Sequence, residues 1–360
     1  MQSRPQYTCT LSSGEHERVE KSVFVQQQGS YCDFSGGDSW VILSPIEQSI
    51  KRKIEAVGTP LKDWDINIYR GVLTGYNEAF IISSEKRDEI LFNCKSEEEK
   101  KRTDELIRPI LRGRDIKRYG YEWAKLYLIA TFPARHYDID KYPAVKQYLL
   151  SFAYDYLIEN GNKWVAENHL ADFCKQKLAQ TGQYVVINGK HITDDKGNKE
   201  KGRKKTSNKW FETQDSISYW EEFFKPKIVY MEIQTDNESE GYPFPCFSYD
   251  ENNCITLNTA YTMSSQSVDV KYILGILNSK LGRFLTKLYV TQLQQRQFRM
   301  LAQYVTRFPL PKWSNNKELI DLVNKELHIH SAETEKRIDA YVERLYGLTA
   351  EESDVIHIED

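Results

Sequence analysis

Several stretches of the chain are short, apolar and rich in β-branched or aromatic residues, a pattern that indicates buried strands. They are LYLIATF (126–132), KIVYMEI (227–233) and ITLNTAYTM (255–263). A fourth stretch, INIYRGVLTGYNEAFII (66–82), has similar content, but two glycines break its alternation. Because strand interiors normally exclude glycine, this interruption predicts either a bulge or the close approach of another backbone.

Two segments in the first third of the chain carry the signals that begin and end a helix. Ser44 precedes Pro45, a pair that predicts a helix start, and Gly58 marks the helix end. Residues 96–113 place acids in the first turn and bases toward the end, as the helix dipole favours. We therefore expect one helix there, closed by Gly113.

From residue 143 onward the sequence predicts helical stretches together with a hairpin. Residues 143–179 are mostly helical in pattern, and residues 184–210 predict a hairpin with a basic, glycine-containing loop. FPLP (308–311) marks a boundary, and two further helical patterns follow it, the second ended by Gly347. Apolar residues at spacings of 4, 4, 3 and 4 predict one amphipathic helix through Ile273, Leu277, Leu281, Phe284 and Leu288.

These elements predict an α+β fold with a strand-rich body and helices collected toward the carboxyl end. Changes in period and charge divide the chain into four consecutive segments. They are a lead-in strand and helix (1–60), a strand-rich body (61–265), a basic helical segment (266–313) and acidic helices (314–360).

Charge is unevenly distributed, although the net charge is only −3. Residues 270–313 hold eight basic residues and no acid, and residues 196–209 hold seven basic residues against one glutamate. From residue 314 to the end, twelve acids face five bases. Such segregation is typical of a surface built for a polyanion beside an acidic, solvated part. Some of the basic side chains alternatively lie along helices with only their ends in water.

Other features narrow the class of protein. No apolar run approaches 18 residues, and the first 20 residues lack the apolar core of a signal peptide. Six cysteines are scattered without a CxxC pair, which favours reduced thiols over disulfides or a zinc site. We therefore expect a cytoplasmic protein without a membrane partner.

The common catalytic motifs are missing from the sequence. We find no phosphate-binding glycine loop, no HExxH and no GxSxG. The histidines of HIH (328–330) would point to different faces of a helix, and Asp138 and Asp140 fit a turn better than a carboxylate pair. We therefore predict no catalytic residues and no metal ligands, and expect a binding protein or the binding part of a larger machine.

Seven motifs then occur in the order seen in one family. They are RGVLTGYNEAFII, PILRGRDIKRYGYEW, KWFETQ, FFKPKIVYMEI, ILGILNSKLGRFL, FPLPKW and IDAYVERLYGLTAEE. From about residue 40 to 350 the chain resembles the TaqI-like carboxyl-terminal specificity domain of type IIG restriction-modification enzymes and related adenine-N6 DNA methyltransferases.

This resemblance implies a module that grips double-stranded DNA and recognises base edges. In the family a separate methyltransferase domain binds S-adenosylmethionine and methylates a flipped adenine. This sequence has no NPPY-type motif, no adenosylmethionine loop and no PD…ExK nuclease motif. We therefore expect no cofactor in this chain, and a partner methyltransferase, with or without a nuclease. The chain is then either a fragment or a separate recognition subunit.

Candidate DNA contacts fall into four groups. In the interrupted strand, the glycines admit DNA or shape a bulge, while small polar groups suit phosphate or base contacts. The second group follows a predicted helix end and suits phosphates, and the basic loop adds a third. The fourth, TQLQQRQFR (291–299), suits base recognition, because Gln pairs with adenine and Arg with guanine; alternatively it is a linker between helices. In order, the candidates are Arg70, Gly71, Thr74, Gly75 and Asn77; Arg112, Arg114, Lys117 and Arg118; Lys204 and Lys205; and Gln292, Gln294, Gln295, Arg296 and Arg299.

The sequence is also compatible with two functions other than DNA recognition. The chain could be an adaptor subunit of a phage-defence complex that contacts proteins and recognises no bases. It could also be an enzyme whose catalytic groups converge only in the fold. The acidic helices carry two apolar stripes that either pack on the helix at 273–288 or dock a partner. The stripes are Leu319, Leu322, Val323 and Leu327, then Ile338, Tyr341, Val342 and Leu345.

Overall fold

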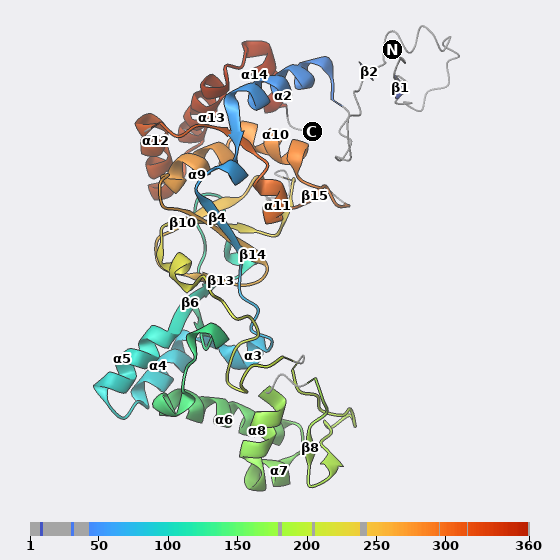
Figure 1. Ribbon diagram of the computed structural model, residues 1–360, viewed down its shortest axis with the longest axis vertical. Helices are drawn as coiled ribbons and strands as arrows, with labels where there is room; N and C mark the ends of the chain where they lie inside the picture. The colour runs from blue at the N-terminus through green and yellow to red at the C-terminus, as the bar shows by residue number, and fades with distance from the viewer. Residues whose placement is uncertain are drawn as a thin grey trace. The chain divides into compact units, whose positions relative to one another are not determined.

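The computed structural model describes residues 43–178, 182–203, 206–237, 243–294, 296–314 and 316–358, with the backbone of residues 8–9 and 30–31. Packing divides the chain into two units (Figure 1). Unit 1 comprises residues 1–66, 233–246 and 265–360, and unit 2 comprises residues 67–232 and 247–264. Each packing unit combines separate parts of the chain, whereas the sequence predicts four consecutive functional segments. That division by function remains a prediction.

One sheet of unit 2 has the strand order β12-β10-β14-β4. Its central strand β10 runs antiparallel to both β12 and β14, and Ile228 faces Tyr249 on one side and Met263 on the other. Four of its five residues are buried, which explains the continuous apolar run in the sequence. The strands are Phe247–Asp250 (β12), Lys227–Met231 (β10), Ala260–Ser265 (β14) and Ile66–Arg70 (β4).

The second sheet of unit 2 has the order β13-β6-β7-β5. β6 is antiparallel to β7 and parallel to β13, so the sheet is mixed. Leu128 and Ile129 of β7 are fully buried, and the buried strand predicted at LYLIATF (126–132) is confirmed for residues 126–129. The strands are Ile255–Thr256 (β13), Ile107–Leu111 (β6), Leu126–Ile129 (β7) and Ile81–Ser83 (β5).

Helices and a small hairpin complete unit 2. α6 packs against α7 and α8, so the helical prediction for residues 143–179 is confirmed. β8 and β9 pair as a hairpin within the predicted range 184–210. The elements are Asn77–Phe80 (α3), Ser84–Phe92 (α4), Glu97–Leu106 (α5), Pro143–Glu159 (α6), Lys163–Asn168 (α7), Leu170–Leu178 (α8), Val186–Ile187 (β8) and Lys190–His191 (β9).

Unit 1 is mainly helical. Its helices are Pro45–Val57 (α2), Val270–Asn278 (α9), Lys280–Tyr289 (α10), Ala302–Val305 (α11), Lys317–His328 (α12), Ala332–Tyr346 (α13) and Ala350–His357 (α14). Three two-stranded pairs accompany them. They are Thr8–Cys9 (β1) with Ser30–Tyr31 (β2), Gly58–Pro60 (β3) with Pro309–Pro311 (β16), and Ile233–Thr235 (β11) with Gln297–Arg299 (β15). With helices and strands largely separated, the α+β prediction is confirmed.

The predicted ends of two helices are confirmed by their geometry. The Ser44 hydroxyl accepts a hydrogen bond from the backbone of Glu47, whose carboxylate accepts one from the Ser44 N–H, so α2 begins with a capping box. Gly347 ends α13 with φ 66°, a conformation that favours glycine. These local signals depend on no distant contact, which is why the sequence contains them in readable form.

The apolar stripes of the acidic helices pack inside unit 1. Leu319 and Val323 of α12 are fully buried against α9 at Gly275. A Cβ on Gly275 would lie 2.9 Å from Val323 Cγ2 and 3.0 Å from Leu319 Cδ1. Packing on the helices near 273–288, the first of the two alternatives, is therefore what the structure shows for these side chains.

The single helix predicted over residues 96–113 is wrong in its second half. α5 ends at Leu106, and residues 107–111 form strand β6, in which Ile107 faces Ile129 of β7. Pro109 has no N–H to donate within a helix, and the β-branched residues Ile107 and Ile110 stand two residues before it and one residue after it. The charge pattern therefore predicts where the helix begins but not where it stops.

The single amphipathic helix predicted through Ile273 and Leu288 is two helices. α10 begins after Ser279, whose hydroxyl accepts from Gly282 N at 3.0 Å. A Cβ on Gly282 would lie 2.2 Å from the Leu277 carbonyl oxygen, so only glycine permits this close turn. The apolar faces of α9 and α10 are both buried, so the apolar spacing continues through the break between them. The spacing alone therefore does not predict the break.

Two predicted strands are also divided. β4 ends at Arg70, the one-turn helix α3 follows at Asn77–Phe80, and β5 resumes at Ile81. The stretch 255–263 forms β13 and β14, which are separated by residues 257–259. FPLP (308–311), expected as a boundary, supplies the buried strand β16.

Candidate nucleic-acid interface

The interrupted strand is packed against protein. Gly71 is buried, and a Cβ there would lie 2.1 Å from the Leu257 carbonyl oxygen. Thr74 is fully buried; its hydroxyl donates to Asn77 Oδ1 at 2.6 Å and accepts from Tyr76 N at 3.1 Å. Both residues are thus packed against protein in this conformation, and a DNA contact from Gly71 or Thr74 remains a prediction.

The second glycine shapes a backbone contact within unit 2. Gly75 has φ +77°, and a Cβ on it would lie 3.0 Å from the Cβ of Gln214. The N–H of Gln214 donates to the Thr74 carbonyl at 3.0 Å. Asp215 exchanges hydrogen bonds with Leu73, donating its N–H and accepting on its carboxylate. Gly75 of GVLTG therefore lets residues 213–215 lie against residues 72–75.

A buried arginine anchors the same region. Arg203, 6% exposed, donates from Nε to the Leu178 carbonyl at 2.6 Å and from Nη1 to the Thr74 carbonyl at 2.9 Å. Nη2 donates to the Glu212 carbonyl. Burial lowers the pKa of Arg203 to about 10, and the nearby Glu212 carboxylate acts in the opposite direction. Counting charges along the basic loop missed this structural role, and no signal in the sequence separates it from its neighbours.

The predicted phosphate-binding group keeps an exposed part. Arg112 forms a bidentate pair with Asp115, with Nη2 2.7 Å from Oδ1 and Nε 3.0 Å from Oδ2, and these hydrogen bonds raise the pKa of Arg112. The expected orientation of an arginine by Asp115 is thus confirmed. Arg114 and Lys117 are exposed, and Arg118 is half-buried. This group offers positive charge at the surface of unit 2.

Two of the remaining candidates of unit 2 are described, and both are exposed. Arg70 is exposed and pairs with Glu232 at 2.9 Å, while its Nε donates to the Asn258 carbonyl at 3.0 Å. Asn77 is also exposed, at the start of α3. Lys204 and Lys205 lie outside the described residues.

The glutamine-rich segment of unit 1 forms a hairpin and not a linker. Gln292 bridges to Phe298, and Leu293 N donates to the Gln297 carbonyl at 2.6 Å. Its return strand β15 pairs with β11, which attaches the hairpin to unit 1. Gln295 lies outside the described residues.

The polar side chains of this hairpin face solvent. Gln292, Gln294, Arg296 and Arg299 are all exposed, whereas Phe298 is buried and 5.1 Å from the Phe244 ring. Arg296 has φ +60°, and its carbonyl accepts from Asp236 N at 3.0 Å, which fixes the turn. An exposed two-stranded ribbon with amide and guanidinium side chains has the dimensions and the chemistry to enter a major groove.

Part of the basic helical segment is neutralised inside unit 1. Arg283 of α10 is 6% exposed and pairs bidentately with Asp236, with Nη2 2.9 Å from Oδ1 and 3.1 Å from Oδ2. Lys287 Nζ lies 3.4 Å from the same carboxylate. These side chains line a cavity of about 490 Å³ together with Gln292 and Arg296 of the hairpin. The eight basic residues therefore do not form one free surface along these helices.

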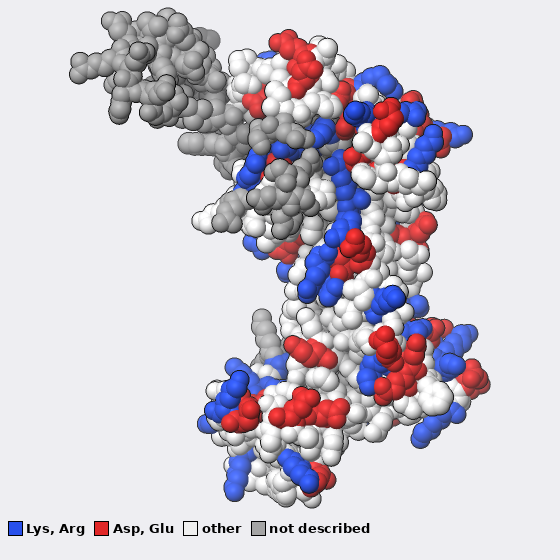
Figure 2. Space-filling model, turned by 180° about the vertical axis from the view of Figure 1, so that it is seen from behind, with Lys and Arg blue, Asp and Glu red and all other residues white. Residues whose placement is uncertain are grey.

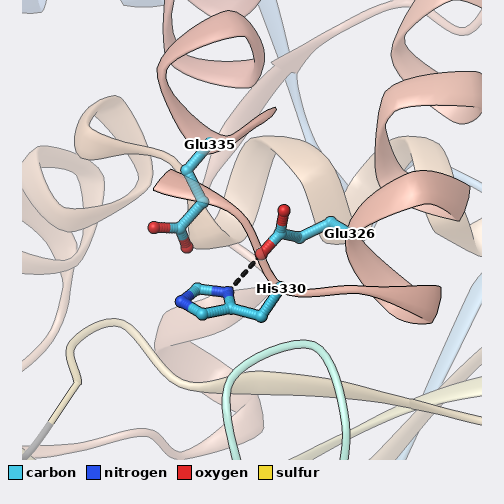
Figure 3. A group of neighbouring side chains, drawn as sticks. All are labelled: Glu326, His330 and Glu335. Atoms are coloured by element: carbon cyan, nitrogen blue, oxygen red, sulfur yellow. Dashed lines mark hydrogen bonds and ion pairs between the residues drawn. The ribbon is translucent and has the colours of Figure 1, made fainter. Parts of the chain in front are cut away.

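Among the described residues, one group of acids and histidine has ligand atoms within 4.8 Å of one another: Glu326, His330 and Glu335 (Figure 3). The buried Glu326 carboxylate accepts from Ser331 N, 3.2 Å from each oxygen, and contacts His330 Nδ1. Ser331 caps α13, so this carboxylate lies at the positive end of a helix, where an anion is stabilised and a cation is not. Helix capping explains the group, and the absence of a metal remains a prediction.

Charges of both signs share the surface. Figure 2 shows Lys and Arg side chains interspersed with Asp and Glu over the face drawn. No helix among the described residues is long and apolar enough to cross a membrane.

Comparison with known proteins now defines the class. The family model of the TaqI-like C-terminal specificity domain matches residues 108–310, more than half of the chain. The chain therefore belongs to this family. The matched range includes the Arg112 group and the whole glutamine-rich hairpin.

Two similar relatives are type II methyltransferases. The chain is 21% identical over 321 residues to the type II methyltransferase M.PaeR7I of Pseudomonas aeruginosa, covering 88% of this chain and 44% of that protein. It is 20% identical to M.XhoI of Xanthomonas vasicola, covering 89% of this chain and 47% of that protein. The chain thus spans less than half the length of these relatives.

Two solved structures show weaker similarity. The type IIL restriction-modification enzyme MmeI, in complex with DNA, matches with a TM-score of 0.44 and 11% identity over 81% of this chain and 34% of that one. The type IIG restriction endonuclease BpuSI matches with a TM-score of 0.41 and 9% identity over 87% of this chain and 33% of that one.

Proposed function

We propose that this chain is the double-stranded-DNA recognition module of a type IIG-like restriction-modification enzyme or adenine-N6 DNA methyltransferase. A separate domain or subunit supplies methyl transfer and binds S-adenosylmethionine, because this sequence has no NPPY-type motif. Membership of a specificity-domain family and relatives that are type II methyltransferases support the proposal.

The observation that carries the proposal is the exposed hairpin at residues 291–299. Gln294 and Arg296 lie at the turn of the hairpin with exposed side chains. The buried side chain of Phe298 anchors the hairpin to the core of unit 1. Glutamine pairs bidentately with adenine and arginine with guanine in the major groove, and each such pair contributes about 1–3 kcal/mol of discrimination. The hairpin therefore supplies base recognition.

A second set of residues supplies affinity without sequence preference. Arg114 and Lys117 are exposed beside the Arg112–Asp115 pair, and their positive charge suits phosphates. Binding that depends on such contacts weakens steeply with salt, because each neutralised phosphate releases counterions. The module therefore combines a base-contacting hairpin with phosphate-binding side chains.

The test is selection of bound duplexes from a random pool by the full 360-residue chain at low and at physiological salt, followed by sequencing. An enriched short motif is the expected result. Arg114→Ala should then weaken binding to every sequence alike, and Lys163→Ala on α7, an exposed lysine paired with Glu167, serves as its control. Failure to retain any duplex at low salt would overturn the proposal.

A protein-interaction adaptor is the second candidate function. The interspersed charges on the face in Figure 2 and the partial neutralisation of α10 by Asp236 favour it, because a polyanion-binding protein usually concentrates positive charge. An adaptor would bind a methyltransferase or nuclease partner equally well with and without DNA, and would enrich no motif.

A further inference from the structure

Residues 184–201 build a small sheet that the candidate contacts described so far do not include. The hairpin turns at Asn188 and Gly189, with φ 49° and 75°, a pair suited to a tight two-residue turn. Bridges join Tyr184 to Lys201 and Thr193 to Lys199, so a third chain segment lies against the hairpin. Three segments make a stiffer platform than an isolated hairpin.

The inner face of this sheet is fixed to the helices of unit 2. Val185, Ile187 and Ile192 are buried. Glu200 also points inward, accepting from Tyr156 Oη and from Lys177 Nζ at 2.5 Å each. The orientation of the sheet on α6 and α8 is therefore determined by both apolar and charged contacts.

The outer face carries an aromatic ring among positive charges. Tyr184 is 49% exposed, with Lys199 Nζ 5.7 Å and Lys201 Nζ 6.0 Å from its ring centroid. The His191 ring lies edge-on to the same tyrosine at 5.6 Å. Both lysines are exposed, so their charges reach solvent close to one ring.

The acidic side chains of residues 184–201 lie on the inner face of the sheet or in the turn that follows it. Glu200 lies on the inner face. Asp194 is held in the next turn, where its Oδ1 accepts from Asn198 N at 2.7 Å and Lys196 N at 3.0 Å, and hydrogen bonds from Asn198 lower its pKa. Asp195 is exposed in the same turn. Two cations therefore lie within 6.0 Å of the Tyr184 ring centroid, while the described acids Glu200 and Asp194 accept hydrogen bonds elsewhere.

We propose that this outer face is a second DNA contact, which binds the sugar–phosphate backbone outside the recognised base pairs. Lys199 and Lys201 bind phosphates, and the ring of Tyr184 packs on the sugar between them. Positive charge beside an exposed aromatic ring complements a polyanion with apolar sugar edges. The inference rests on the proposed function.

The experiment measures binding of the full chain to a mixed-sequence duplex between 50 and 200 mM salt. Lys199→Gln/Lys201→Gln removes two charges from the face, and Tyr184→Ala removes the ring. Lys100→Gln/Lys101→Gln is the matched control, because it removes two exposed lysines from α5 of the same unit. Loss of two phosphate contacts makes the log–log salt slope shallower by about 2, so the affinity advantage of wild type over the variant falls about tenfold across this range.

Each outcome separates this inference from the proposed function. A shallower slope for Lys199→Gln/Lys201→Gln, with the control unchanged and the selected motif unaltered, supports the second contact. If wild type binds DNA and both Lys199→Gln/Lys201→Gln and Tyr184→Ala bind it unchanged, the second contact is overturned and the proposed function stands. If those variants instead lose only a methyltransferase partner, the face is a protein contact and the inference is wrong. If wild type binds no DNA at low salt, both fail.

Discussion

Two segments of this protein carry similar residues, and the structure uses them in opposite ways. Residues 71–77 and residues 291–299 both place small or amide side chains between apolar ones. In the first, Thr74 is fully buried and its polar atoms bond to neighbours in the same unit. In the second, Gln294 and Arg296 are exposed at a hairpin turn. The comparison teaches that residue type alone does not identify a recognition surface; the packing of the backbone decides it.

The largest expected effect comes from removing the arginine that holds the first segment. Arg203→Met keeps an apolar stem but leaves the carbonyls of Leu178, Thr74 and Glu212 without this donor. Buried acceptors without partners cost about 1–3 kcal/mol each, so we expect the free energy of unfolding to fall by about 3 kcal/mol or more. Urea unfolding measures it, with the exposed Arg114→Met as the control. Equal stability of the two variants would contradict a structural role for Arg203.

Gly71→Ala should have the next largest effect. Its new Cβ would meet the Leu257 carbonyl oxygen at 2.1 Å, so one backbone segment must move. Overpacking of this kind costs about 1–3 kcal/mol, which urea unfolding resolves. Gly120→Ala is the matched control, since nothing lies within 4 Å of the Cβ it would add. A Gly71→Ala protein that keeps its stability but loses DNA binding would return this glycine to the interface.

A smaller effect is expected in unit 1, which carries the hairpin, at the contact between α2 and α14. Burial would raise the pKa of Glu352, but hydrogen bonds from Lys53, the Thr349 N–H and Ser49 outweigh it and lower that pKa to about 2. A lowered carboxylate pKa stabilises the fold above pH ~4.5, and this contribution is lost as the pH falls toward the folded-state value.

Glu352→Gln should therefore lower stability at pH 7 by about 1–2 kcal/mol and reduce the loss of stability between pH ~4.5 and about 2. Chemical denaturation across this pH range measures both effects. The exposed neighbour Glu351→Gln is the control. An identical dependence of stability on pH for the two variants would show that the hydrogen bonds to Glu352 contribute nothing to stability.

The smallest effect on stability is expected at the second segment. Gln294→Ala and Arg296→Ala remove exposed side chains, so each should change the free energy of unfolding by less than about 0.5 kcal/mol. Arg296 has φ +60°, and alanine tolerates this conformation no worse than arginine. A thermal or urea unfolding curve superimposable on wild type is the predicted result. A large loss of stability would place these side chains in the packing of unit 1.

The sequence predicts well where local chemistry determines structure. The cap at Ser44, the end at Gly347 and the buried strand β7 all follow from residues adjacent in the chain. The family resemblance, based on seven ordered motifs, is confirmed over residues 108–310. These features depend little on what packs against them from elsewhere.

The sequence fails where distant contacts decide. Residues 107–111 look helical by charge but form a strand that pairs with β7 and β13. Arg203 and Lys201 are two residues apart in one basic stretch, yet the first is 6% exposed and the second faces solvent. The break at Ser279 leaves the apolar spacing intact. The first two outcomes depend on neighbours far along the chain, which no local pattern records, whereas the break at Ser279 depends on its own cap and on Gly282, and the continuous apolar spacing conceals it.

The most direct measurement repeats the random-duplex selection with a Gln294→Ala/Arg296→Ala variant beside wild type and compares the enriched motifs. If the hairpin recognises bases, the variant should lose preference at particular positions of the motif and keep it at the others. An unchanged motif, or an equal loss of binding on every sequence, would contradict the account, because the exposed hairpin would then contribute no base recognition.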